Sequence, residues 1–156
     1  MENTNDQTKH FEVAEIQLSY KSNVKPSMRP KVTSSGEARA VLMQSWDMAK
    51  IELVEQFKVL FTNRANKVLG ILELSTGGMT ATVADPKLIF VAALKSGACG
   101  IILCHNHPSG SLNPSQADIE LTKKIAQGCK ILDMQLLDHV IVTCESYFSF
   151  QDEGLI

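Results

Sequence analysis

The chain has 156 residues, a mass of 17.1 kDa and a formal net charge of -2, with 15 Lys and Arg against 17 Asp and Glu. Its hydrophobic fraction of 44% and charged fraction of 21% indicate a globular domain with a buried core and exclude a disordered or collagen-like chain. The near-balance of charge argues against a protein that mainly coats nucleic acid or an anionic membrane.

Targeting signals and cysteine usage point to a cytoplasmic protein. No run approaches the roughly 18 consecutive apolar residues that a membrane helix needs. The polar, acidic residues 1–6 lack the basic start and apolar middle of a signal peptide. No Cys-x-x-Cys pair occurs, so we expect four reduced cysteines that act as small buried residues: Cys99, Cys104, Cys129 and Cys144.

Residues 1–35 are predicted to form a frayed tail, a strand and a connector. Residues 11–20 alternate, with Ala14, Ile16, Leu18 and Tyr20 on one side, which predicts a strand with one buried face. An exposed edge there would allow pairing with a second copy in a homo-oligomer. The basic segment 21–31 has no interleaved aromatic residue, which favours a solvated connector over a nucleic-acid patch.

The domain at residues 36–156 begins with a helix and a hairpin. Ser34 and Glu37 have the spacing of a capping box, which predicts a helix that runs to about Leu53. Residues 57–61 and 67–74 are β-prone runs on either side of a four-residue turn, and they predict a hairpin.

The rest of this domain alternates between helices and strands. Asp85-Pro86 predicts the start of a helix that ends at Gly97. Residues 100–104 predict a strand buried on both faces, and a capped helix follows with one apolar face, formed by Leu121, Ile125, Cys129 and Leu132. Strands are expected at 136–142 and 147–150. The order β, α, β, β, α, β, α, β, β predicts a mixed α/β layer structure.

Two histidines close the buried strand and indicate a metal site. His105 and His107 are two residues apart, so in extended chain both imidazoles point to the same side. A catalytic zinc needs a third protein ligand, and Asp118 in the first turn of the next helix is well placed for it. On the alternative interpretation, Ser115 and Asp118 form only a helix cap and bind no metal.

With these residues in place, the pattern resembles a known family. His105-x-His107-x7-Ser115-x2-Asp118 resembles the JAMM (JAB1/MPN) metallopeptidase signature. The surrounding segments His-Asn-His-Pro-Ser-Gly and Leu-Leu-Asp-His-Val-Ile-Val resemble the bacterial RadC-like branch, over roughly residues 53–156. The resemblance implies a cytidine-deaminase-like α-β-α sandwich that holds one zinc ion through His105, His107 and Asp118.

The resemblance also implies a glutamate that transfers protons without binding the metal. Glu55, which directly precedes a Phe-Lys-Val-Leu strand, fits this role better than Glu52. Zinc would activate water, Glu55 would take its proton, and Ser115 would act as a helix cap, an oxyanion donor or both. The implied function is a metallopeptidase or isopeptidase that cleaves an amide bond in a peptide or protein substrate.

Other functions compete with this one. The RadC resemblance brings a link to DNA repair, although the charge balance does not support nucleic-acid binding. Asn106 replaces the Ser or Thr of deubiquitinating relatives, which argues against ubiquitin-like substrates. A zinc nucleobase deaminase needs a Pro-Cys-x-x-Cys motif, which is missing. The alternative function is a nucleic-acid-associated or metal-stabilised interaction module without peptidase activity. Asp138-His139 either orients a ligand or is structural.

Overall fold

The computed structural model describes residues 12–77 and 84–156, which form a mixed α/β fold. The elements in chain order are η1 (Pro26–Met28), α1 (Ser35–Met43), β1 (Gln56–Thr62), β2 (Val68–Thr76), α2 (Pro86–Ser96), β3 (Gly100–Asn106), α3 (Gln116–Ile131), β4 (Gln135–Val142) and β5 (Tyr147–Ser149). No helix within these residues combines the length and apolar character needed to cross a bilayer.

The five strands form one mixed sheet in the order β2-β1-β3-β4-β5. The predicted hairpin is confirmed as the antiparallel pair β1 and β2, and β1 also pairs antiparallel with β3. β3 and β4 are parallel, and β5 returns antiparallel to β4. Every residue of β3 is buried, which confirms the prediction of a central strand covered on both faces.

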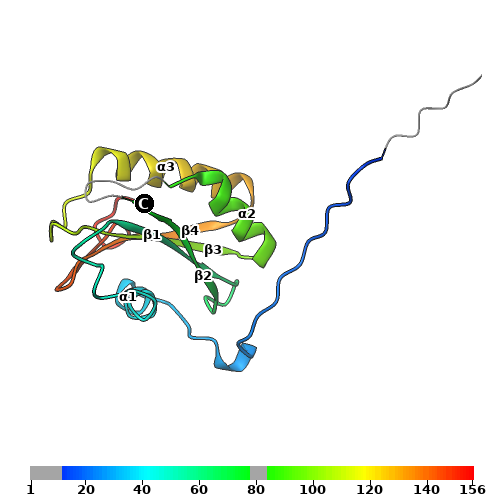
Figure 1. Cartoon of the computed structure of the whole chain (residues 1–156), viewed down its shortest axis with the longest axis horizontal. Helices are drawn as coiled ribbons and strands as arrows, with labels where there is room; N and C mark the ends of the chain where they lie inside the picture. Colours follow the sequence, from blue (N-terminus) through cyan, green and yellow to red (C-terminus); the bar gives the residue numbers. More distant parts are fainter. Residues whose placement is uncertain (1–11, 78–83) are drawn as a thin grey trace, which may run out of the picture.

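Helices cover both faces of the sheet (Figure 1), with α2 and α3 on one side and α1 on the other. The side chains of β3 alternate between the two layers: Ile101 and Leu103 pack with α2 and α3, whereas Ile102 and Cys104 pack with α1. The predicted α-β-α arrangement is confirmed.

The helix that Ser34 begins is shorter than predicted. Ser34 Oγ accepts the Glu37 N–H, as expected, but α1 ends at Met43 rather than near Leu53. The Ser45 hydroxyl donates to the Leu42 carbonyl, and Asp47 Oδ1 accepts the Ala49 N–H. Such local bonds between side chains and backbone compete with helical ones, so the chain continues in turns.

The other predicted helix boundaries are confirmed, with one difference in the apolar face. Asp85 caps α2, and Gly97 ends it in the left-handed conformation at φ 67°. In α3, Ile125 and Cys129 are buried as expected. Leu132, however, follows the last residue of the helix and is 36% exposed.

The prediction of a strand at 11–20 is wrong. Residues 12–20 form no strand and are exposed, with Ile16 at 87% and Leu18 at 84%. This segment extends away from the domain (Figure 1), and Tyr20 anchors its end by donating to the Leu69 carbonyl. An alternating sequence forms a strand only where another strand is available to pair with its backbone N–H and C=O groups, and within the described residues this segment has no such partner strand. Phe11 lies outside the described residues.

The cysteines only partly match the prediction. All four lie in the described part of the chain, and none is in a disulfide. Cys104 and Cys129 are buried, whereas Cys99 is half-buried. Cys144 is exposed in the turn between β4 and β5, so its predicted burial is wrong.

Candidate metal centre

The end of β3 places two histidines on the same face of the sheet. His105 lies opposite Phe57 of β1, is buried, and stacks on the Phe57 ring with centroids 5.7 Å apart and planes 3° apart. His107 follows two residues later, and its ring centroid is 4.8 Å from that of His105. The strand period therefore brings the two imidazoles together, as the spacing predicts.

Asp118 reaches the histidines from the first turn of α3. Ser115 is the N-cap of that helix, and its Oγ accepts the Asp118 N–H at 3.1 Å. In return, Asp118 Oδ2 accepts the Ser115 N–H at 2.7 Å and the Ser115 hydroxyl at 2.6 Å. This reciprocal capping box fixes the carboxylate at the helix N-terminus, where the helix dipole favours a negative charge.

The three candidate ligands converge on one point. His105 Nε2 is 3.1 Å from His107 Nε2 and 3.3 Å from Asp118 Oδ1, and His107 Nε2 is 3.9 Å from Asp118 Oδ2. In a tetrahedral zinc site with bonds of about 2.1 Å, neighbouring ligand atoms are about 3.4 Å apart. The His/His/Asp group could hold a metal ion. Capping and metal binding, which the sequence presents as alternatives, are compatible.

The loop after β3 fixes the proton of His107. Its Nδ1 is 2.8 Å from the Ser111 carbonyl oxygen. A carbonyl only accepts hydrogen bonds, so Nδ1 carries a hydrogen, and in the neutral form of the ring the lone pair is at Nε2. This lone pair and the Asp118 carboxylate face the same point, so a cation bound there would be attracted to both.

The electrostatics of Asp118 also suit a cation. Burial alone would raise the pKa of this carboxyl, but the hydrogen bond and charge of His105 in its protonated form, together with two hydrogen bonds from Ser115, hold it well below its ordinary value. Asp118 is therefore ionised at neutral pH and available as an anionic ligand.

His139 contacts His105 from behind. It lies in β4, is fully buried, and its Nε2 is 2.9 Å from His105 Nδ1. Its Nδ1 is 2.7 Å from Thr122 Oγ1 of α3. Burial lowers the pKa of His139 well below its ordinary value, so the ring is neutral. Asp138 points to the opposite face of the sheet, and its carboxylate accepts the backbone N–H of His139.

Glu55 lies just before β1 and outside the group of three candidate ligands. It is half-buried. Because β1 and β3 are antiparallel with Phe57 opposite His105, continuing the register brings Glu55 level with His107. The competing Glu52 is exposed and accepts a hydrogen bond from Cys144 at 3.5 Å.

Asn106 has a structural role that sequence reasoning missed. It is fully buried, and its Oδ1 accepts the Gln56 N–H at 2.7 Å. Its Nδ2 donates to the carbonyls of Ile51 at 2.7 Å and Val54 at 2.9 Å. These bonds fix the backbone on both sides of Glu55. The only sequence signal was an amide between two candidate ligands, which by itself names no partner.

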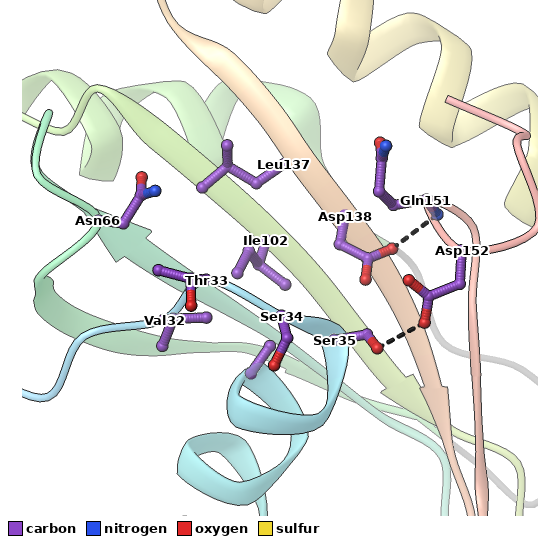
Figure 2. Close-up of a pocket in the computed structure, with 11 residues that line it drawn as sticks. Val32, Thr33, Ser34, Ser35, Asn66, Ile102, Leu137, Asp138, Gln151 and Asp152 are labelled. Atoms are coloured by element: carbon purple, nitrogen blue, oxygen red, sulfur yellow. Dashed lines mark hydrogen bonds between the residues drawn. The ribbon is translucent and has the colours of Figure 1, made fainter.

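A separate hollow of about 170 Å³ lies on the α1 side of the sheet (Figure 2). Asp138 faces it, and its carboxylate accepts the Gln151 N–H and the Ser149 hydroxyl. Burial raises the pKa of Asp138. None of the candidate ligands lines this hollow, so it is not part of the metal centre.

Comparison with known proteins gives one family match and many relatives. The RadC-like JAB domain model matches residues 32–155. The chain is 45% identical to a UPF0758 protein of Flavobacterium johnsoniae over 145 residues, which is 92% of this chain and 62% of the relative. It is 42% identical to one of Fusobacterium nucleatum over 105 residues, and 43% identical to one of Porphyromonas gingivalis over 103 residues.

The relatives are longer than the part that matches. The Fusobacterium and Porphyromonas alignments each cover 45% of the relative and 67% and 65% of this chain, respectively. The chain thus spans less than two thirds of the length of these relatives.

Proposed function

This chain belongs to the RadC-like JAB domain family, and on that premise we propose that it is a zinc-dependent hydrolase that cleaves an amide bond in a peptide or protein. The observation that carries the proposal is the convergence of ligand atoms from His105, His107 and Asp118, separated by 3.1 to 3.9 Å. Two imidazoles and one carboxylate are a donor set that zinc prefers, and they leave a fourth position for water or substrate.

The groups around this point have different roles in the proposed reaction. Zinc, when bound, supplies a water nucleophile near neutral pH and polarises the substrate carbonyl. Glu55, level with His107 and outside the ligand group, takes a proton from the attacking water and passes it to the leaving amine. Asn106 supports this role by fixing the backbone that carries Glu55.

Ser115 has two functions in the proposal. Its backbone N–H and hydroxyl hold Asp118 Oδ2, which leaves Oδ1 directed at His105. The hydroxyl is also the candidate donor to the oxyanion that forms when water attacks the carbonyl. To serve as that donor it must turn away from Asp118 Oδ2.

Metal content tests the first half of the proposal. Purified wild type, His107→Ala and Asp118→Ala are compared by elemental analysis after zinc reloading and removal of free metal. We expect about one zinc per wild-type chain and a sharp loss in both variants. A wild type that retains no zinc would overturn the proposal and favour an interaction module, with Ser115 and Asp118 acting only as a helix cap.

Peptide hydrolysis tests the second half, with two glutamates as a matched pair. The zinc-loaded protein is incubated with a proteome-derived peptide library, and newly formed termini are identified by mass spectrometry. Glu55→Gln is expected to keep its zinc and lose cleavage by about 10²- to 10⁴-fold, whereas Glu52→Gln keeps both. Equal activity of the two variants would remove Glu55 from the mechanism.

A further inference from the structure

A continuous chain of hydrogen bonds connects the candidate metal centre to the start of α3 through the interior of the domain. His105 Nδ1 is 2.9 Å from His139 Nε2, and His139 Nδ1 is 2.7 Å from Thr122 Oγ1. Thr122 Oγ1 is 2.6 Å from the Asp118 carbonyl oxygen. His105, His139 and Thr122 are almost completely buried, with exposures of 0%, 0% and 2%, so solvent does not compete for these bonds.

The direction of every bond in this chain follows from its last member. The Asp118 carbonyl has no hydrogen, so a separation of 2.6 Å between two oxygens requires that the Thr122 hydroxyl donate to it. The hydroxyl has only one hydrogen and must therefore accept from His139 Nδ1–H. A neutral His139 protonated at Nδ1 has a lone pair at Nε2, which accepts from His105 Nδ1–H.

We propose that Thr122 and His139 are positioning residues that fix the tautomer of His105, so that its Nε2 lone pair faces the candidate metal position. His107 reaches the same tautomer independently, through the Ser111 carbonyl. With the hydrogens of both neutral rings at Nδ1, the two Nε2 atoms, which lie 3.1 Å apart, both present lone pairs to the candidate metal position. Of the two roles open to His139, the proposal takes that of orienting a ligand.

Reversing the donor and acceptor roles along this chain of hydrogen bonds shows what Thr122 contributes. If Thr122 could not accept a hydrogen bond, His139 would be free to carry its hydrogen at Nε2 instead. That hydrogen would point at His105 Nδ1 and force the His105 hydrogen onto Nε2. A protonated Nε2 cannot bind a metal, so zinc would first have to reverse two buried tautomers. Thr122 contacts no candidate ligand atom, yet it controls whether His105 is ready to bind.

Two substitutions at Thr122 separate this role from simple packing. Thr122→Val has nearly the same shape but cannot accept or donate, whereas Thr122→Ser keeps the hydroxyl and is the matched control. Two quantities are measured for wild type and both variants. The first is the tautomer of each buried histidine, from nitrogen-15 ring spectra of the metal-free protein at about pH 8, where ordinary histidines are neutral. The second is zinc affinity, by competition with a chromophoric chelator.

The proposal predicts hydrogens at Nδ1 of both His105 and His139 in wild type and in Thr122→Ser. In Thr122→Val we expect a mixture of tautomers and zinc binding that is about 10- to 100-fold weaker. A wild-type His139 protonated at Nε2 would overturn the proposal, as would Thr122→Val with wild-type tautomers and wild-type affinity. If Thr122→Val does not fold, the wild-type spectrum still decides the bond directions.

The zinc comparison rests on the proposed function, because it assumes that the site binds zinc, but the spectra do not. Failure of the two ideas is therefore distinguishable. A wild type without zinc affinity but with both hydrogens at Nδ1 would reject the hydrolase and keep the tautomer assignment. A wild type that binds zinc but has His139 protonated at Nε2 would reject the tautomer assignment and leave the proposed hydrolase standing.

Discussion

The candidate centre has a closed half and an open half, which the fold holds in different ways. The closed half is His105, Asn106 and His139, which are completely buried in the sheet. The open half is His107, Ser115 and Asp118, held by the loop after β3 and the first turn of α3. The His105 side chain is 1% exposed, whereas those of His107 and Asp118 are 16% and 13% exposed.

This difference in burial predicts different effects of substitutions on the free energy of unfolding and on metal affinity. When a buried side chain is removed, the groups that it bonded stay in the interior without a hydrogen-bond partner. Near the surface, water takes the place of the lost partner. Substitutions in the closed half should therefore cost both folding energy and metal affinity. Substitutions in the open half should cost metal affinity with much smaller changes in the free energy of unfolding.

Asn106→Ala should give the largest loss of stability. It removes three hydrogen bonds to backbone groups at Ile51, Val54 and Gln56 and leaves those groups unpaired in a buried environment. We expect a loss of about 4 kcal/mol in the free energy of unfolding of the metal-free protein, measured in urea. Asn113→Ala, an exposed asparagine of the loop, is the control and should be within about 0.5 kcal/mol of wild type. A small effect of Asn106→Ala would contradict the division into halves.

His105→Ala and His107→Ala compare the two halves directly. Both should abolish zinc binding. Without metal, His105→Ala should lower the free energy of unfolding by about 3 kcal/mol, because it leaves a cavity beside Phe57 and an unpaired Nε2 on His139. His107→Ala should cost less than about 1 kcal/mol, since water can reach its partner Ser111. Equal losses in urea denaturation would show that burial does not distinguish the two histidines.

Ser115→Ala should lower stability by about 1 kcal/mol through the lost helix cap. Ser34→Ala is the matched control, since Ser34 Oγ also accepts a backbone N–H in the first turn of its helix and lies away from the metal centre. We expect similar losses of stability from the two substitutions and weaker zinc binding only in Ser115→Ala. If zinc affinity is unchanged in Ser115→Ala, the cap is not needed to orient Asp118.

Asp118 at the metal centre and Asp138 on the other face of the sheet have pKa values that folding shifts in opposite directions. Donors around Asp118 hold its pKa down, whereas burial raises that of Asp138. A group whose pKa is raised on folding contributes stability that is present below its unfolded pKa, about 3.9, and is lost as the pH rises through the folded value. The stability of wild type relative to Asp138→Asn should therefore fall between pH 4 and pH 7, measured by urea unfolding at both values. A relative stability that rises with pH would show that the three hydrogen bonds to Asp138 outweigh its burial.

The open half was predictable from sequence because its geometry is local. A period of two along β3 places His105 and His107 on one face, and helix-capping rules place Asp118 beside Ser115. These periodicities hold whatever the rest of the chain does. The order of the elements from α1 onward and the central position of β3 were predicted for the same reason, from apolar runs and the turn and helix-capping residues between them.

The hydrogen bonds of the closed half were not predictable because they join distant segments. Asn106 bonds residues 50 or more positions away, and His139 lies 34 positions from His105. A sequence shows that a polar residue is in an apolar run, but not which backbone groups meet it. The end of α1 was missed for a related reason, since short polar side chains there bond to nearby backbone instead of continuing the helix.

The N-terminal segment shows that an alternating pattern alone does not establish a strand. Its removal should have the smallest effect on the free energy of unfolding. Ile16 and Leu18 are exposed, so deleting residues 12–19 exposes almost no further apolar surface and breaks no bond of the sheet. We expect the free energy of unfolding to change by less than about 0.5 kcal/mol and the zinc affinity to be unchanged. Tyr20→Phe is the companion variant, because it removes the bond to Leu69 and keeps the segment. A loss of several kcal/mol on deletion, together with a change from dimer to monomer in light scattering, would instead indicate that this segment forms its strand against a second copy of the chain.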